Sequence, residues 1–289
     1  MRSRTGSPVS DPRYCLLGQI PPEKPIAVLL LESDIGEPPE YWHLLVDRLA
    51  SAGLLCLIRI RPGYLWRPTG GADIIGREFV TQLVTEAETL IYLAHSLGAL
   101  MAILDGAARP LHSRIPDTVM LLDPATPEMI AELRSNKFEL GRIRRSLDIS
   151  AMSVGLGISR FSQPIEQAYL WYPIRTYRRC KAFRHNLHNA MTARREFNIV
   201  VSQDLSIEPI RHPTTATLIH SEFAIPDADR YADSQRQLAA SLQIAPSRIV
   251  TLRQTRFKSA LTSPVALNAI ASTVREFINH SHREGIGSD

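Results

Sequence analysis

Ser96 lies in a sequence context that can turn a serine hydroxyl into a nucleophile. It sits in LIYLAHSLGALMA, where an apolar segment over residues 90–93 runs directly into a helix of small residues. A sharp turn between a strand and a helix exposes such a serine, and small residues two positions before and after it prevent backbone clashes. Ala94 and Gly98 occupy these two positions. The segment therefore predicts a nucleophile on a tight turn, and a serine that only caps the helix is the alternative.

Two backbone amides are expected to stabilise negative charge beside this serine. Leu97 supplies the N–H that follows the nucleophile, and the loop after the first long strand supplies a second through Ile35. That loop also carries three carboxylates, which oppose an oxyanion unless they turn away: Glu32, Asp34 and Glu37.

An acid and a base should complete the site. Asp123 ends an apolar strand 27 residues after Ser96, so both should lie at neighbouring carboxyl ends of one sheet. A simple Asp-Pro turn is the alternative for Asp123. His220 ends a later strand and is the best-placed base, although its position is explained better by a histidine that only makes a hydrogen bond at a strand end. Four further histidines are less well placed: His43, His95, His185 and His188.

Alternating strands and helices must position these residues. Apolar runs predict strands over residues 25–31, 54–60, 90–93, 118–122, 215–219 and 248–252. Helical spacing predicts helices over residues 41–52, 73–88, 97–107, 229–242 and 264–280. This alternation favours a mostly parallel sheet with helices on both faces. We expect an α/β core from residues 23–126 and 211–282, a helical lid insertion over 127–210, a polar leader over 1–22 and a tail over 283–289.

Composition limits the function classes. The chain has 289 residues, of which 44% are hydrophobic, and its three cysteines (Cys15, Cys56 and Cys180) form no motif. We therefore expect a reducing, cytoplasmic location. The sequence contains no run of eighteen apolar residues, so we expect no membrane span. No cofactor is expected, and His185 with His188 lacks a third ligand for zinc, so no metal is expected either.

The insertion is strongly basic. Residues 142–195 contain ten Arg and one Lys against Asp148 and Glu166, a local charge of +9 in a chain of net charge +4. Aromatic residues are mixed with these cations. One lid face could line an apolar acyl pocket while the cations face an acidic partner, and a solvated basic surface is the alternative. No nucleic-acid motif accompanies the charge, so nucleic acid is not expected as a partner.

Four segments together resemble one known family. The turn AHSLGA, the segment LLDPA, the basic insertion and the segment IHSEFAIPDADRY are similar to the thioesterase branch of the α/β-hydrolases, over roughly residues 26–278. The resemblance implies an α/β-hydrolase fold with a lid and a catalytic set of Ser96, Asp123 and a histidine. It also implies acyl chains delivered by an acyl carrier protein of polyketide or peptide synthesis. Residues expected to contact the carrier or substrate are Trp171, Arg175, Arg178, Arg179 and Arg184.

One departure from the family concerns the base. Its histidine is expected in the loop after the last strand, which reads LRQTRFKSAL here, with Arg256 or Phe257 in the expected place. A guanidinium keeps its proton near neutral pH and cannot be a general base. Three interpretations therefore stay open: an acyl hydrolase or acyltransferase with an unusual base, a non-hydrolytic cyclase, lyase or isomerase on a polyketide-like ligand, and a binding partner without catalysis.

Overall fold

The computed structural model describes most of the chain. It covers residues 13–17, 27–49, 54–66, 72–75, 77–104, 114–156, 174–203, 205, 215–222, 228–252 and 260–286. In this part of the chain, no helix combines the length and the hydrophobicity that crossing a membrane requires.

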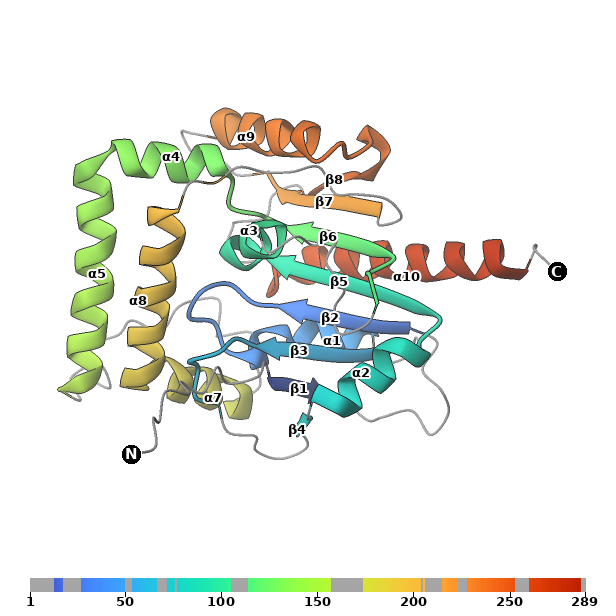
Figure 1. Cartoon of the computed structure of the whole chain (residues 1–289), viewed down its shortest axis with the longest axis horizontal. Helices are drawn as coiled ribbons and strands as arrows, with labels where there is room; N and C mark the ends of the chain where they lie inside the picture. Colours follow the sequence, from blue (N-terminus) through green and yellow to red (C-terminus); the bar gives the residue numbers. More distant parts are fainter. Residues whose placement is uncertain are drawn as a thin grey trace, which may run out of the picture.

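A single eight-stranded sheet forms the centre of the described structure, in the order β4-β1-β3-β2-β5-β6-β7-β8 (Figure 1). Its strands are β1 (Arg13–Leu17), β2 (Ala27–Glu32), β3 (Leu54–Ile60), β4 (Ala72–Ile75), β5 (Thr89–His95), β6 (Thr118–Leu122), β7 (Thr215–Ser221) and β8 (Ile249–Leu252). Six neighbouring strands of this sheet pair in parallel, as the alternating pattern predicted: β3, β2, β5, β6, β7 and β8.

The antiparallel edge of the sheet was not predicted. β1 pairs antiparallel with both β3 and β4. β1 lies inside the segment expected to be a polar leader, and it buries Tyr14, Cys15 and Leu16 against the sheet. β4 takes residues 72–75, where the sequence predicted the first turn of a helix. β6 and β8 are equally short, but they lie within the strand–helix alternation that identified them, whereas β1 and β4 lie outside it.

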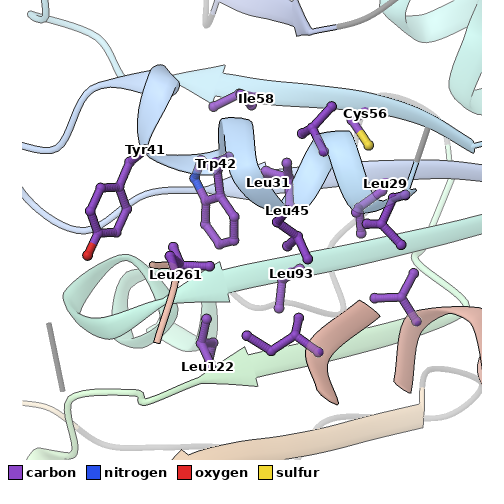
Figure 2. Packing of buried hydrophobic residues seen from close by; sticks show 14 of the residues in the cluster. Leu29, Leu31, Tyr41, Trp42, Leu45, Cys56, Ile58, Leu93, Leu122 and Leu261 are labelled. Carbon is purple, nitrogen blue, oxygen red and sulfur yellow. The ribbon is translucent and has the colours of Figure 1, made fainter. Parts of the chain in front are cut away.

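Helices cover both faces of the sheet, and the side chains of each strand alternate between them. Leu29 and Leu31 of β2 pack in a core with α1 (His43–Leu49) and α10 (Pro264–Ile286), and Figure 2 shows part of this cluster. Val28 and Leu30 face the other core, with α2 (Arg77–Glu86), α3 (Ser96–Leu104) and α9 (Ala228–Ser241). Because both faces of the strand are covered, it reads as a continuous apolar run. Two short 3₁₀ turns complete the core, η1 (Pro39–Trp42) and η4 (Pro246–Arg248).

The insertion between β6 and β7 forms a helical lid. It contains α4 (Pro127–Ser135), α5 (Lys137–Gly155), α7 (Ile174–Arg184) and α8 (Leu187–Ser202). The side chains of Thr126 and Asn136 cap the first two helices by accepting hydrogen bonds from Met129 N–H and Glu139 N–H. α5 and α8 stand side by side at the end of the sheet toward which the parallel strands point (Figure 1). The lid therefore lies over the carboxyl edge, where ligands bind in open α/β folds.

Candidate functional site

Ser96 lies on a strained turn between β5 and α3. Its φ is +54°, a left-handed conformation that a residue with a side chain adopts only when its surroundings enforce it. Gly98 lets the main chain of Ser33 pack closely against this turn, because a Cβ at position 98 would lie 2.1 Å from the carbonyl oxygen of Ser33. Ala94, where the family pattern has glycine, is fully buried in the core. The local geometry is that of a nucleophile turn.

Both predicted oxyanion amides point at one atom. The N–H of Ile35 donates to Oδ1 of Asp34 at 2.7 Å, and the N–H of Leu97 donates to the same oxygen at 3.1 Å. A carboxylate of the chain itself thus sits where a substrate carbonyl oxygen would bind. Burial raises the pKa of Asp34, and the negative charge of Glu37 raises it further.

Asp123 is held by groups other than a histidine. It is fully buried, has a φ of +44° and accepts three hydrogen bonds. Oδ1 accepts from Ser221 N–H at 2.6 Å and from Tyr231 Oη at 2.9 Å, and Oδ2 accepts from Ser221 Oγ at 2.7 Å. These contacts join β6 to β7 and α9.

His220 also has another partner. Its Nε2 lies 3.1 Å from Oγ1 of Thr251, the residue opposite it on β8. Burial lowers the pKa of His220, although the charge of Asp123 opposes this shift. Among the described residues, no hydrogen bond joins Oγ of Ser96 to an imidazole. The predicted set of Ser96, Asp123 and His220 is therefore not connected as a relay in this conformation.

A cavity of about 310 Å³ opens between the turn and the lid. Its wall includes Asp34, Glu37 and His95 from the core and Arg184 from α7, whereas neither Ser96 nor His220 is among its lining residues. The cavity is thus lined by acid–base groups beside the nucleophile turn.

His95 is the most buried of these groups, with 2% of its surface exposed. Its Nδ1 lies 3.5 Å from Oε2 of Glu37, and its ring packs against Tyr41 and Trp42 at centroid distances of 6.0 and 6.4 Å. Burial acts to lower the pKa of His95, but the adjacent carboxylate of Glu37 outweighs it, so the pKa is raised. The carboxylate therefore favours the protonated imidazole more than water does.

Asp34, Glu37 and His95 are also the one group in the described part of the chain with metal-ligand spacing. One donor atom from each lies within 4.8 Å of the others. However, Oδ1 of Asp34 already accepts two amide hydrogen bonds, and Glu37 faces His95. The carboxylate of Asp34 is thus compensated by two N–H groups, and the carboxylate of Glu37 by His95. The arrangement fits an acid–base cluster better than a metal centre.

Comparison with known proteins places the fold. No family model matches this sequence, and no curated protein matches it in sequence. An epoxide hydrolase mutant from Solanum tuberosum aligns over 93% of this chain and 96% of its own, with a TM-score of 0.60 and 16% identity. MenH from S. aureus aligns over 93% and 99%, with a TM-score of 0.54 and 10% identity. The chain has the α/β-hydrolase fold. At these identities the likeness shows the fold alone.

A carboxylesterase structure from Nitrososphaera gargenis gives the same result, with a TM-score of 0.56, 11% identity, and coverage of 95% of this chain and 98% of that one. The predicted fold class is thereby confirmed. The thioesterase branch is not distinguished by these likenesses, because structures of an esterase and of epoxide hydrolases align alike, and it stays a prediction.

The basic residues that were expected to contact a carrier or substrate lie in different surroundings. Arg178 is exposed on α7, and the charge of Arg179 acts on buried Glu40. Arg184 lines the cavity, with its guanidinium 3.9 Å from Oε1 of Glu37. Arg175 lies in α7, but its side chain is outside the described atoms, and Trp171 is outside the described residues.

The remaining histidines lie apart from the nucleophile. His43 pairs with Asp47 on the surface of α1, and His188 is exposed on α8. His185 is half-buried after α7.

Sequence reasoning had noted the acidic oxyanion loop, but it did not predict that Asp34 fills the space between the amides. The presence of an acid where the family usually has glycine was the available signal.

Proposed function

We propose that this chain processes an acyl group, taken from a thioester or ester, through Ser96. The observation that carries the proposal is the convergence of two backbone amides, from Ile35 and Leu97, on one oxygen beside a strained serine. Such a pair of donors is what an acyl-transfer site needs for the oxyanion of its tetrahedral intermediate. The left-handed φ of Ser96 supports the same conclusion, because a nucleophile on a sharp strand-to-helix turn adopts such a strained conformation, and here its side chain is buried, with 3% of the residue exposed.

The reaction would begin when the substrate carbonyl oxygen replaces a carboxylate oxygen as the acceptor of the two N–H groups. The substrate carbonyl oxygen displaces Oδ1 of Asp34 from the two N–H groups, and Oγ of Ser96 attacks the carbonyl carbon. The thiol or alcohol then leaves and the acyl group remains on Oγ. The proton of Oγ must pass to an acceptor, and without a positioned imidazole this step is slow, with a loss on the order of 10⁴-fold or more relative to a complete triad. We therefore propose slow acyl transfer or hydrolysis.

Asp34 has the role of a resident competitor in this proposal. Its carboxylate accepts two amide hydrogen bonds that the substrate needs, and hydrogen bonds to a charged group are each worth about 1.5–3 kcal/mol. Removing the carboxylate should make Ser96 more reactive by about 10- to 100-fold, because both N–H groups can then bind the substrate oxygen without displacing a side chain.

Labelling with a fluorophosphonate tests both points. We expect slow formation of an adduct on Ser96 in the wild type, none in Ser96→Ala, and faster formation in Asp34→Ala. Asp47→Ala, which removes an exposed carboxylate on α1, is the matched control and should label like the wild type. Intact-mass spectrometry over time gives the rates. Absence of an adduct in both folded wild type and Asp34→Ala would reject Ser96 as a nucleophile.

His220 remains the proposed base, since it lies at the carboxyl end of β7 and burial lowers its pKa. It would have to exchange Thr251 for Ser96. The variant His220→Gln should then abolish labelling in the Asp34→Ala background. Unchanged labelling would show that another group accepts the proton.

Delivery of the acyl group by an acidic carrier protein is a further part of the proposal. Exposed Arg178 and Lys181 on α7 are the supporting residues, since cations on a surface steer an acidic partner. Reversing Arg178 and Arg179 to Glu should weaken binding of such a carrier, most strongly at low salt. Equal binding at all salt concentrations would argue against it.

A second candidate function is proton transfer on a ligand in the cavity, as in a lyase or isomerase. The favouring observation is that Asp34, Glu37 and His95 line the cavity while Ser96 does not. In this case activity on the ligand survives Ser96→Ala and is lost in His95→Gln. The opposite pattern supports the acyl mechanism.

A further inference from the structure

Exposed apolar side chains gather on the lid. Of the eleven large hydrophobic residues that are exposed in the described part of the chain, eight lie on α4, α5 and α8: Met129, Phe138, Ile149, Met152, Leu156, Leu187, Met191 and Ile199. Single exposed apolar residues are ordinary, whereas a concentration on neighbouring elements marks an interaction site.

On α5 these residues form one stripe. Phe138, Ile149, Met152 and Leu156 are 83%, 55%, 64% and 70% exposed. Arg142 and Arg145 continue the same i+3 and i+4 spacing between Phe138 and Ile149, so they share this face of the helix. The stripe runs the length of a 19-residue helix, about 28 Å.

α8 repeats the arrangement at strict four-residue spacing. Leu187, Met191 and Ile199 are 42%, 54% and 42% exposed, and Arg195 fills the fourth position of the series. On both helices, apolar side chains and guanidinium groups thus share one exposed face.

The two stripes face the same way, away from the core. The opposite sides of the helices line the cavity, through Leu147 and Ser150 of α5 and Ala190 and Ala193 of α8. The helices are tied edge to edge by the Asp148–Arg194 ion pair and by a hydrogen bond from Arg144 to Asn198. Figure 1 shows α5 and α8 as a pair at one end of the molecule. We call the exposed side of this pair the lid outer surface.

This surface is also positively charged. α5 and α8 together carry six Arg and Lys residues against three Asp and Glu residues, a net charge of +3, and one of these acids, Glu196, pairs with Arg61 of the core. Arg142 and Arg194 pair with acids of α5, whereas Arg145 and Arg195 make no ion pair with a residue that the structure describes. A hollow of about 710 Å³ opens here, and Arg144, Arg194 and Arg195 lie in its wall beside Met191 and Ile199.

We propose that the lid outer surface docks on an anionic lipid bilayer. Phe, Ile, Leu and Met side chains would enter the boundary between headgroups and acyl chains, while the guanidinium groups bind lipid phosphates and the hollow accepts a headgroup. Long stripes of highly exposed apolar residues, interrupted by Arg, suit a fluid surface that adapts to them. An acidic protein would satisfy the cations but leave Phe138 and Leu156 without a matching pocket.

Vesicle sedimentation tests the proposal with the full chain. The probes are vesicles of phosphatidylcholine alone and vesicles in which about a third of the lipid is phosphatidylglycerol. We expect binding to the anionic vesicles, weakened by salt, and at least tenfold weaker binding to neutral ones. The double variant Ile149→Asp with Met152→Asp should lose binding at least tenfold, because charges replace the inserted side chains. Val265→Asp, an equally exposed apolar position on α10, is the matched control and should bind normally.

Charge reversal gives an independent readout. Arg145→Glu with Arg195→Glu should weaken binding to anionic vesicles at least fivefold per charge, since each cation near such a surface contributes a comparable factor. Arg236→Glu on α9 is the exposed control. Absence of vesicle binding by the wild type would overturn the proposal, as would equal loss in Val265→Asp. Binding of an acidic carrier protein that is lost in the lid variants, without vesicle binding, would assign the surface to a protein instead. Fluorophosphonate labelling of Ser96 is unaffected by any of these outcomes, so the two proposals fail separately.

Discussion

Asp34 replaces the group that the backbone around Ser96 is arranged to bind. Its Oδ1 accepts hydrogen bonds from Ile35 and Leu97, and burial together with Glu37 raises its pKa. Under the proposed function, this one side chain would occupy the position of the oxyanion, and a single carboxylate rather than the fold would decide whether the site is open or filled.

The turn at Ser96 also requires a residue without a side chain at position 98, which is Gly98. Gly98→Ala should destabilise the protein by about 2–4 kcal/mol, because the new methyl group would meet the Ser33 carbonyl at 2.1 Å and backbone cannot yield cheaply. Chemical denaturation measures the loss.

Gly141 provides the control, since it lies within α5 and nothing stands within 4 Å of an added Cβ. Gly141→Ala should stabilise the protein by about 0.5–1 kcal/mol through helix propensity. Equal effects of the two substitutions would contradict the packing argument.

Asp123 acts at the scale of elements. Its carboxylate accepts hydrogen bonds from Ser221 and Tyr231, so it joins the end of β6 to β7 and α9. Every described contact of this side chain is structural, even though its position after β6 is the one that the resemblance assigns to a catalytic acid.

Tyr231→Phe and Ser221→Ala should each lower the free energy of unfolding by about 1–3 kcal/mol, because each leaves a buried carboxylate with one donor fewer. If Asp123 serves the fold alone, the rate of Ser96 labelling should stay within about twofold. A large fall in labelling with unchanged stability would instead indicate a catalytic role. Ser234→Ala, which removes a local hydroxyl on α9, is the control and should change little.

The lid and core form one unit at the scale of the whole molecule. Glu196 of α8 accepts a hydrogen bond from Tyr64 Oη at 2.6 Å and pairs with Arg61 Nε at 3.1 Å. Asn189 bonds the main chain of Leu65 through both ends of its amide, at 2.6 and 2.9 Å. The loop after β3 is thus fastened to the inner side of α8, which fixes the roof of the cavity.

Glu196→Ala should loosen the lid. It leaves Arg61, only 7% exposed, with one fewer counter-charge, at an expected cost of about 3 kcal/mol. We expect faster proteolytic cleavage within α5–α8 than in the core, together with a lower melting temperature. Asn198→Ala, which removes an exposed hydrogen bond of the same helix, should stay within about 0.5 kcal/mol of the wild type. Uniform cleavage throughout the chain would contradict a lid held by this contact.

The sequence by itself determined the parallel sheet, the covering helices and the turn at Ser96. These features follow from local patterns, such as the continuous apolar runs of β2 and β5 and the small residues around the serine. The antiparallel strands β1 and β4 were missed, because they stand outside the alternation of strands and helices and are placed only by pairing with each other and with β3.

Only the tertiary structure decided which polar atoms meet. Sequence spacing predicted that Ser96, Asp123 and His220 lie at one edge of the sheet. In the structure, however, Asp123 accepts hydrogen bonds from Ser221 and Tyr231, and His220 contacts Thr251. Hydrogen bonds depend on separations of a few tenths of an ångström between side chains far apart in the chain. The sequence could therefore indicate which residues gather at the site, whereas the pairing that places Asp34 in the oxyanion position required three-dimensional coordinates.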